Sequence, residues 1–119
     1  MLPKQHRLLR TRDFTRVRRR GRSAGDSLLV LYVLPVRSPD LRVGFSVSKR
    51  VGKAVTRNRV KRVMREIARR DLGKMRRGQD LVFIARPAAA QATYADLDAS
   101  MARALGKTGA LRAEETRHA

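Results

Sequence analysis

The chain has 119 residues, enough for one domain with a hydrophobic core and too few for two typical domains. Its 29 basic side chains outnumber its 10 acidic ones, so the formal net charge is +19 at pH 7. An excess this large destabilises a compact chain by self-repulsion, and we therefore expect a polyanionic partner. The chain has no cysteine, which excludes disulfides, thiolate nucleophiles and cysteine-bound zinc and fits the reducing cytoplasm where we expect the protein.

Other classes of protein are disfavoured by what the chain lacks. Its two histidines, His6 and His118, stand near the ends of the chain, so we expect neither a histidine metal site nor a Ser-His-Asp triad. No apolar run approaches the ~20 residues that span a bilayer, and residues 1–14 lack the apolar segment of a secretory signal. A transit peptide is an alternative for this arginine-rich start. We expect no membrane partner and no small-molecule substrate.

The net charge is confined to two segments. Residues 1–25 hold nine basic side chains and one acidic one, and residues 49–77 hold thirteen and two. The remaining segments are balanced, whereas a merely soluble protein intersperses its charges. This distribution predicts a folded scaffold that presents one or two basic surfaces.

The first half of the chain predicts a helix and two strands. The helix covers residues 12–20, with Thr11 as its N-cap and Gly21 at its end. Residues 27–34 form an apolar run typical of a strand buried on both faces. Residues 41–48 alternate between a core face and a small, polar face. The core face has Leu41, Val43, Phe45 and Val47, and the other face has Arg42, Gly44, Ser46 and Ser48. A ligand could approach the backbone on that small face, and an ordinary solvent face is the alternative.

The second half predicts a long helix, a strand and a last helix. The long helix starts within residues 53–56 and ends near Asp71. Opposite its apolar stripe lie Asn58, Lys61, Arg62, Arg65 and Arg69. Residues 79–86 read as an apolar strand, and Thr93 and Asp96 resemble a capping box that opens the last helix. This order predicts an α+β domain with helices on one face of a small sheet and a βαβ crossover. We expect one domain over residues 1–119, frayed at 1–5 and 107–119.

The strongest functional signal is the segment 46–66, SVSKRVGKAVTRNRVKRVMRE. It predicts a strand that leads through a basic turn into a helix with a cationic outer stripe. Guanidinium groups suit phosphate because they donate two parallel hydrogen bonds, so the segment indicates nucleic-acid binding. A solvated helix face is the alternative. The acidic residues are scattered and Gly52-Lys53 lacks the rest of a phosphate loop, so we expect no catalytic side chain and no metal site in the protein.

The run KRVGKAV at residues 49–55 and the motif Arg57-Asn58-Arg59 resemble the family of protein subunits of bacterial ribonuclease P. The likeness covers about residues 5–105, in the family's order. It implies an αβββαβα two-layer sandwich with a small mixed sheet, a central basic helix, a left-handed βαβ crossover and a further short strand near residues 22–25. It also implies that the protein is part of an endoribonuclease that removes the 5′ leader of precursor tRNA. A partner RNA would carry the catalysis and hold most of the Mg²⁺.

The resemblance also implies the binding residues. The residues that would contact the catalytic RNA are Lys49, Arg50, Lys53, Arg57, Asn58, Arg59, Lys61, Arg62 and Arg65. Those that would line a cleft for the single-stranded leader are Phe14, Arg18, Tyr32, Ser46 and Ser48. Many family members have an aromatic residue in place of Arg18, whose guanidinium could stack or bind phosphate instead. Core packing is the alternative for Phe14 and Tyr32, and we prefer it for Phe45 and Phe83.

Three other classes of protein are alternatives, and the main one, a structural RNA-binding protein of the ribosome, shares the charge and size of this chain. A ribosomal RNA-binding protein would co-sediment with ribosomes, and an independent nuclease would cleave RNA without a partner. A membrane-active basic peptide is the third, and the alternating strands disfavour it because they require a packed sheet.

Overall fold

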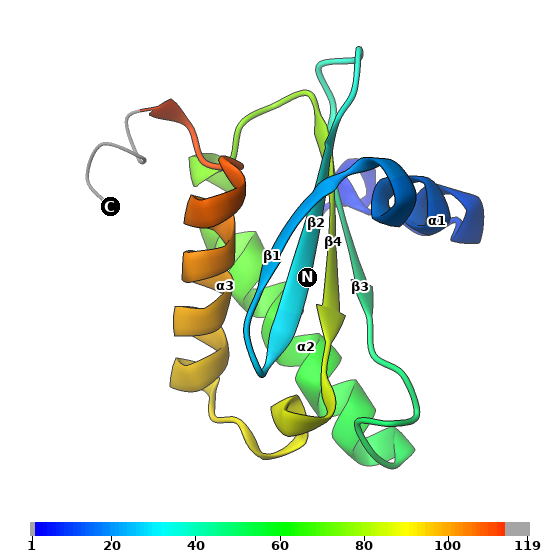
Figure 1. Ribbon diagram of the computed structural model, residues 1–119, viewed down its shortest axis with the longest axis vertical. Helices are drawn as coiled ribbons and strands as arrows, with labels where there is room; N and C mark the ends of the chain where they lie inside the picture. The colour runs from blue at the N-terminus through cyan, green and yellow to red at the C-terminus, as the bar shows by residue number, and fades with distance from the viewer. Residues whose placement is uncertain (1, 114–119) are drawn as a thin grey trace.

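The computed structural model describes residues 2–113, which form three helices and one four-stranded sheet in the order αβββαβα (Figure 1). The elements are α1 (Thr11–Arg20), β1 (Arg22–Gly25), β2 (Leu29–Pro35), β3 (Leu41–Ser46), α2 (Ala54–Asp71), β4 (Gln79–Ala85) and α3 (Tyr94–Thr108). Three short 3₁₀ turns accompany them: η1 (Lys4–His6), η2 (Leu72–Lys74) and η3 (Pro87–Gln91). The expected α+β class and the short strand β1 are confirmed.

The sheet has the strand order β1-β2-β4-β3, which makes β3 an edge strand. The pairs β1–β2 and β2–β4 are antiparallel, and β3 runs parallel to β4. Parallel neighbours require a crossover, which α2 supplies as the expected βαβ unit. The left-handed sense of this crossover stays a prediction.

Helices cover both faces of the sheet, not one face as the pattern of elements predicts (Figure 1). On the first face, α2 and α3 pack on the main core, where Phe45 and Phe83 stack with ring centroids 5.9 Å apart. On the second face, Val17 of α1 packs with Leu8 and with Val82 of β4 in a small cluster. The core role preferred for the two phenylalanines is confirmed.

β2 is fully buried on one face only. Leu29, Leu31 and Val33 are inaccessible beneath α2 and α3, whereas Tyr32 is half-buried on the α1 side. The expected burial on both faces is therefore only partial, because one short helix does not cover the whole second face. This exposed remainder of the sheet is where the site lies.

The helix ends follow their local chemistry. The capping box of Thr93 and Asp96 is confirmed, with reciprocal hydrogen bonds of 3.1 and 3.0 Å. The assignment of Thr11 as an N-cap is wrong, because the carbonyl of Arg10 already accepts from the amide of Asp13 at 3.0 Å. The hydroxyl of Thr11 makes no capping bond, and α1 starts at that residue.

Both ends of the described chain pack on the domain, which differs from the fraying expected there. Leu2 is 3 % exposed, and Ala110 is inaccessible to solvent. The amide of Arg112 donates to the carbonyl of Lys74 at 2.8 Å. Residue 1 and residues 114–119 lie outside the described part of the chain. Within that part, no helix is long and apolar enough to cross a membrane.

Candidate nucleic-acid interface

The stripe predicted on the long helix and the two arginines beside it, Arg57 and Arg59, divide into three groups in the structure. Asn58, Arg62 and Arg69 are exposed and project from α2 into solvent. Lys61 and Arg65 are half-buried and line a cavity beside β3. Arg57 and Arg59, at the first turns of α2, are also half-buried.

Arg57 and Arg59 hold neighbouring backbone in place. The Nε of Arg57 donates to the carbonyl of Gly52 at 3.1 Å, which fastens the turn before α2. The guanidinium of Arg59 donates to the carbonyls of Ala90 at 2.8 Å and Ala92 at 3.4 Å, which fastens η3 to α2. These two arginines therefore have a structural role, and their predicted contact with RNA stays a prediction.

The turn between β3 and α2 presents three exposed cations, Lys49, Arg50 and Lys53. Backbone hydrogen bonds shape this turn, from the amide of Val51 to Ser48 at 3.1 Å and from the amide of Gly52 to Lys49 at 3.2 Å. The N-terminus of α2 follows, with no acidic residue in its first turn and no side-chain cap. Its free amide groups add to the positive potential of the turn, which favours phosphate there.

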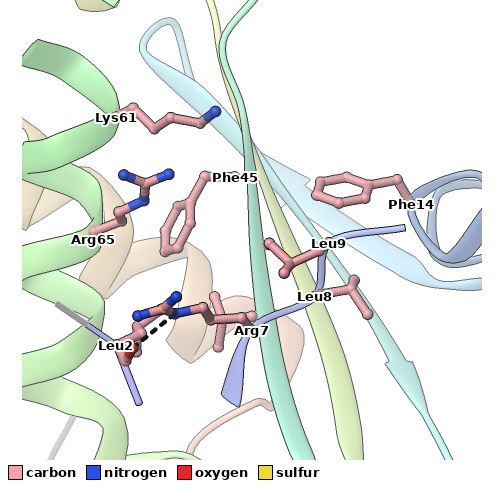
Figure 2. A pocket seen from close by; sticks show the side chains of 10 residues that line it. Leu2, Arg7, Leu8, Leu9, Phe14, Phe45, Lys61 and Arg65 are labelled. Atoms are coloured by element: carbon pink, nitrogen blue, oxygen red, sulfur yellow. Dashed lines mark hydrogen bonds between the residues drawn. The ribbon is translucent and has the colours of Figure 1, made fainter. Parts of the chain in front are cut away.

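Two adjoining hollows form a cleft at the outer edge of β3. The first has a volume of about 250 Å³ and the second about 390 Å³. They share four lining residues, Leu9, Phe14, Phe45 and Lys61. Figure 2 shows Lys61 and Arg65 reaching from α2 toward Phe45, while Phe14 approaches β3 from the other side. Aromatic and apolar surface beside cations is the combination that holds single-stranded nucleic acid.

Phe14 both packs and lines this cleft, because its ring lies on Gly44. A Cβ on Gly44 would stand 2.6 Å from the Cζ of Phe14 and 3.0 Å from the carbonyl oxygen of Leu8. The small face predicted on β3 thus receives a side chain of the protein at Gly44. Farther along the strand, Ser46 lines the open second hollow.

The structure brings together three of the five residues expected in the leader cleft. Phe14, Arg18 and Ser46 all line the second hollow. Tyr32 lies on the same face of the sheet but lines neither hollow, and it packs beside the Leu8 cluster instead. Ser48 lies beyond the end of β3, in the turn, where its hydroxyl accepts from the amide of Arg50 at 3.3 Å. The alternation along β3 stops at Ser46, which separates Ser48 from the cleft.

The segment that forms the floor and rim of the cleft is not evident from the sequence. Residues 7–9 run along the edge of β3, where the amide of Leu8 donates to the carbonyl of Val43 at 3.0 Å. Leu8 is buried, whereas Leu9 is 74 % exposed at the rim. Arg7 lines the first hollow and donates to the carbonyl of Leu2 at 2.9 Å. A pair of leucines has no periodicity, so only the structure distinguishes their roles.

Most acidic side chains of the described residues are paired with arginines inside the domain. Arg70 bridges Asp71 and Asp98, and the Asp98 partner contributes most to raising the pKa of Arg70 above its usual range. Burial opposes the ionisation of Asp26, yet hydrogen bonds from Arg103, Ser100 and two backbone amides outweigh it and lower the pKa of Asp26. No cluster of acidic and histidine residues able to hold a metal ion occurs within residues 2–113.

A mixed α+β domain that combines a cationic helix with an aromatic and basic cleft has the form of an RNA-binding protein. The family model described as Ribonuclease P matches residues 2–109. A ribonuclease P protein component of Clostridium botulinum is 45% identical over 107 residues, covering 89% of this chain and 96% of the relative. One of Alkaliphilus metalliredigens is 38% identical over 102 residues, covering 86% and 92%.

Solved structures agree with this assignment. The chain superposes on the Staphylococcus aureus RNase P protein with a TM-score of 0.84 at 29% identity, covering 92% of this chain and 100% of that one. The Thermotoga maritima RNase P protein gives a TM-score of 0.73 at 29% identity, covering 82% and 92%. The chain belongs to the ribonuclease P protein family, so it is an RNA-binding protein component of ribonuclease P with a role in tRNA 5′ processing.

Proposed function

We propose that this protein binds a catalytic RNA through α2 and its preceding turn, and holds the 5′ leader of precursor tRNA in the cleft at β3. The partner RNA carries the catalysis. The observation that supports this division is that Lys61 and Arg65 line the cleft from α2, the helix that also carries the exposed cations. One RNA on α2 and a second in the cleft would therefore lie side by side on this protein.

Two consequences follow from this arrangement. Cations placed between two RNAs screen their mutual repulsion, so the holoenzyme needs less Mg²⁺ than the RNA alone. A cleft that binds the leader favours precursor over mature tRNA, because only the precursor carries that segment. We further propose that the Mg²⁺ is held mainly by the RNA, since Asp13, Asp80, Asp71, Asp98 and Asp26 all have arginine partners in the protein. We place this activity in the cytoplasm.

Cleavage of a precursor tRNA by the catalytic RNA at low Mg²⁺, with and without the protein, tests the proposal. We expect efficient cleavage only when both are present, and none in a reaction with protein alone. About five phosphate contacts give a salt slope near −4, so assembly weakens by roughly two orders of magnitude between 50 and 200 mM salt. Tight RNA binding without stimulation would instead favour a ribosomal role, and cleavage by the protein alone would favour an independent nuclease.

A further inference from the structure

Apart from Arg18, which lines the cleft, the arginines of α1 are not part of the interface described above. This helix of ten residues contains five arginines, at positions 12, 16, 18, 19 and 20, and one acidic residue, Asp13. Asp13 is 8 % exposed and faces the sheet, where it pairs with Arg16. Arg18, Arg19 and Arg20 are exposed, and the structure gives none of them a side-chain hydrogen bond or an ion pair within residues 2–113.

The last turn of a helix attracts cations through the helix dipole, which is a structural reason for basic residues there. That attraction does not account for three neighbouring guanidinium groups, because they also repel one another and form no ion pair within residues 2–113. Three adjacent unpaired arginines on one turn are better explained by an external polyanion.

α1 divides its face of the sheet into two hollows. The cleft lies along one flank, where Arg18 lines it together with Phe14 and Ser46. A second hollow of about 500 Å³ lies along the opposite flank, where Arg16 and Arg20 line it. Its other lining residues are Leu34, Pro35, Val36, Arg37, Ser38, Asp40 and Arg42. We call this second hollow the arginine groove.

Consecutive helical residues are about 100° apart around the axis, so Arg18, Arg19 and Arg20 sweep about 200° around α1. Arg18 lies on the cleft side and Arg20 on the groove side. Arg19, between them, points away from the sheet. The three residues thus form a continuous cationic path over the last turn of α1, from the cleft to the arginine groove.

We propose that the precursor tRNA leader, after leaving the cleft, crosses the last turn of α1 on Arg19 and Arg20 and enters the arginine groove beside Arg37. This inference rests on the proposed leader cleft and extends its footprint to upstream nucleotides. The occupant is single-stranded RNA, because the path continues from the proposed leader cleft, and its arginines would hold that strand by its phosphates. Ion pairs with buried Asp80 fix Arg16 and Arg42, so α1 presents its outer side rigidly.

The test measures binding of the assembled holoenzyme to precursor tRNAs whose leaders lengthen one nucleotide at a time, with mature tRNA as the reference. The test variant is Arg19→Gln/Arg20→Gln, which keeps good helix formers in α1. The control variant, Arg76→Gln/Lys107→Gln, removes the same charge from exposed positions near the C-terminal end of α3. Circular dichroism verifies that each variant is folded.

We expect wild-type affinity to rise again once the leader extends past the cleft. The test variant loses this second rise and keeps the first, whereas the control retains both. Two phosphate contacts on a single strand contribute a salt slope of about 1.4. The affinity that the wild type gains in the second rise should therefore fall about sevenfold between 50 and 200 mM salt. Adding Arg37→Gln deepens the loss for the longest leaders only.

Three results would overturn the inference. The first is a loss of precursor affinity in the test variant that is equal at every leader length, and the second is a loss of its affinity for the catalytic RNA when no substrate is present. The third is a wild-type affinity for precursor tRNA that stays constant once the leader extends past the cleft. The second of these would assign the arginines to the catalytic RNA. A wild-type holoenzyme that does not prefer precursor over mature tRNA would overturn the proposed function itself, which distinguishes the two failures.

Discussion

The carboxylate of Asp80 accepts two hydrogen bonds from the guanidinium of Arg42, which lies directly opposite it on the neighbouring strand. The Nε bond measures 3.0 Å and the Nη2 bond 2.9 Å. Arg16 of α1 adds a third contact at 3.2 Å, and Asp13 pairs with both arginines. This network joins α1 to β3 and β4, and the bond to Asp80 is the main reason that the pKa of Arg42 is raised.

Replacing Asp80 by alanine should destabilise the protein and widen the cleft. Asp80 is inaccessible to solvent, and its loss leaves Arg16 and Arg42 with Asp13 alone as their counter-charge, at 3.3 and 3.8 Å. We expect a loss of about 3 kcal/mol, at the low end for a broken buried pair because both arginines can turn toward water. Urea unfolding measures this loss. In conditions where the variant is folded, leader discrimination should fall more than catalytic-RNA affinity, and equal losses would contradict a positioning role for the network.

Gly44→Ala should disturb the cleft through Phe14. The new methyl group would meet the Phe14 ring at 2.6 Å, so the ring must move outward into the cleft. We expect about 1–3 kcal/mol of destabilisation from overpacking and weaker discrimination between precursor and mature tRNA. Gly73→Ala is the matched control, since no atom lies within 4 Å of its added Cβ. Restoration of stability by a second change, Phe14→Leu, would identify the ring as the cause, and no restoration would contradict it.

Arg62→Ala and Arg59→Ala should separate RNA binding from folding. Arg62 is exposed without a side-chain partner among the described residues, so its loss should leave the unfolding midpoint unchanged and flatten the salt slope of assembly by about 0.9. Arg59 fastens η3 through two carbonyls, so its loss should also reduce the unfolding free energy by about 1–2 kcal/mol. Equal thermal stability of the two variants would contradict the structural role given to Arg59.

Acid should weaken the contact between α3 and the turn after β1. The pKa of Asp26 is lower in the folded protein than in the unfolded chain, so its contribution is present above the unfolded pKa of about 3.9 and is lost as the pH falls below it. Asp26→Asn should therefore cost stability at pH 7 and reduce the slope of stability against pH below 4. The free energy of unfolding, measured for both proteins across this pH range, tests the prediction. An unchanged dependence of stability on pH below 4 would show that Asp26 does not contribute to it.

Most secondary-structure elements and the family are evident from the order of residues alone, because they depend on local patterns. The alternation in β3, the apolar stripe of α2 and the Thr93–Asp96 capping box each require only neighbouring residues. The motif at residues 57–59 carried the family resemblance, which the comparisons confirmed.

The fold determines which residues share the cleft and which arginines are free, because these relationships join residues far apart in the chain. Phe14 reaches Gly44 because α1 crosses the second face of the sheet, and Leu9 joins them because its segment docks on the edge of β3. Arg16 and Arg19 are alike in the sequence, yet one is neutralised by a buried carboxylate far along the chain and the other is exposed. Pairing of charges across the sheet depends on distances that the order of residues does not contain.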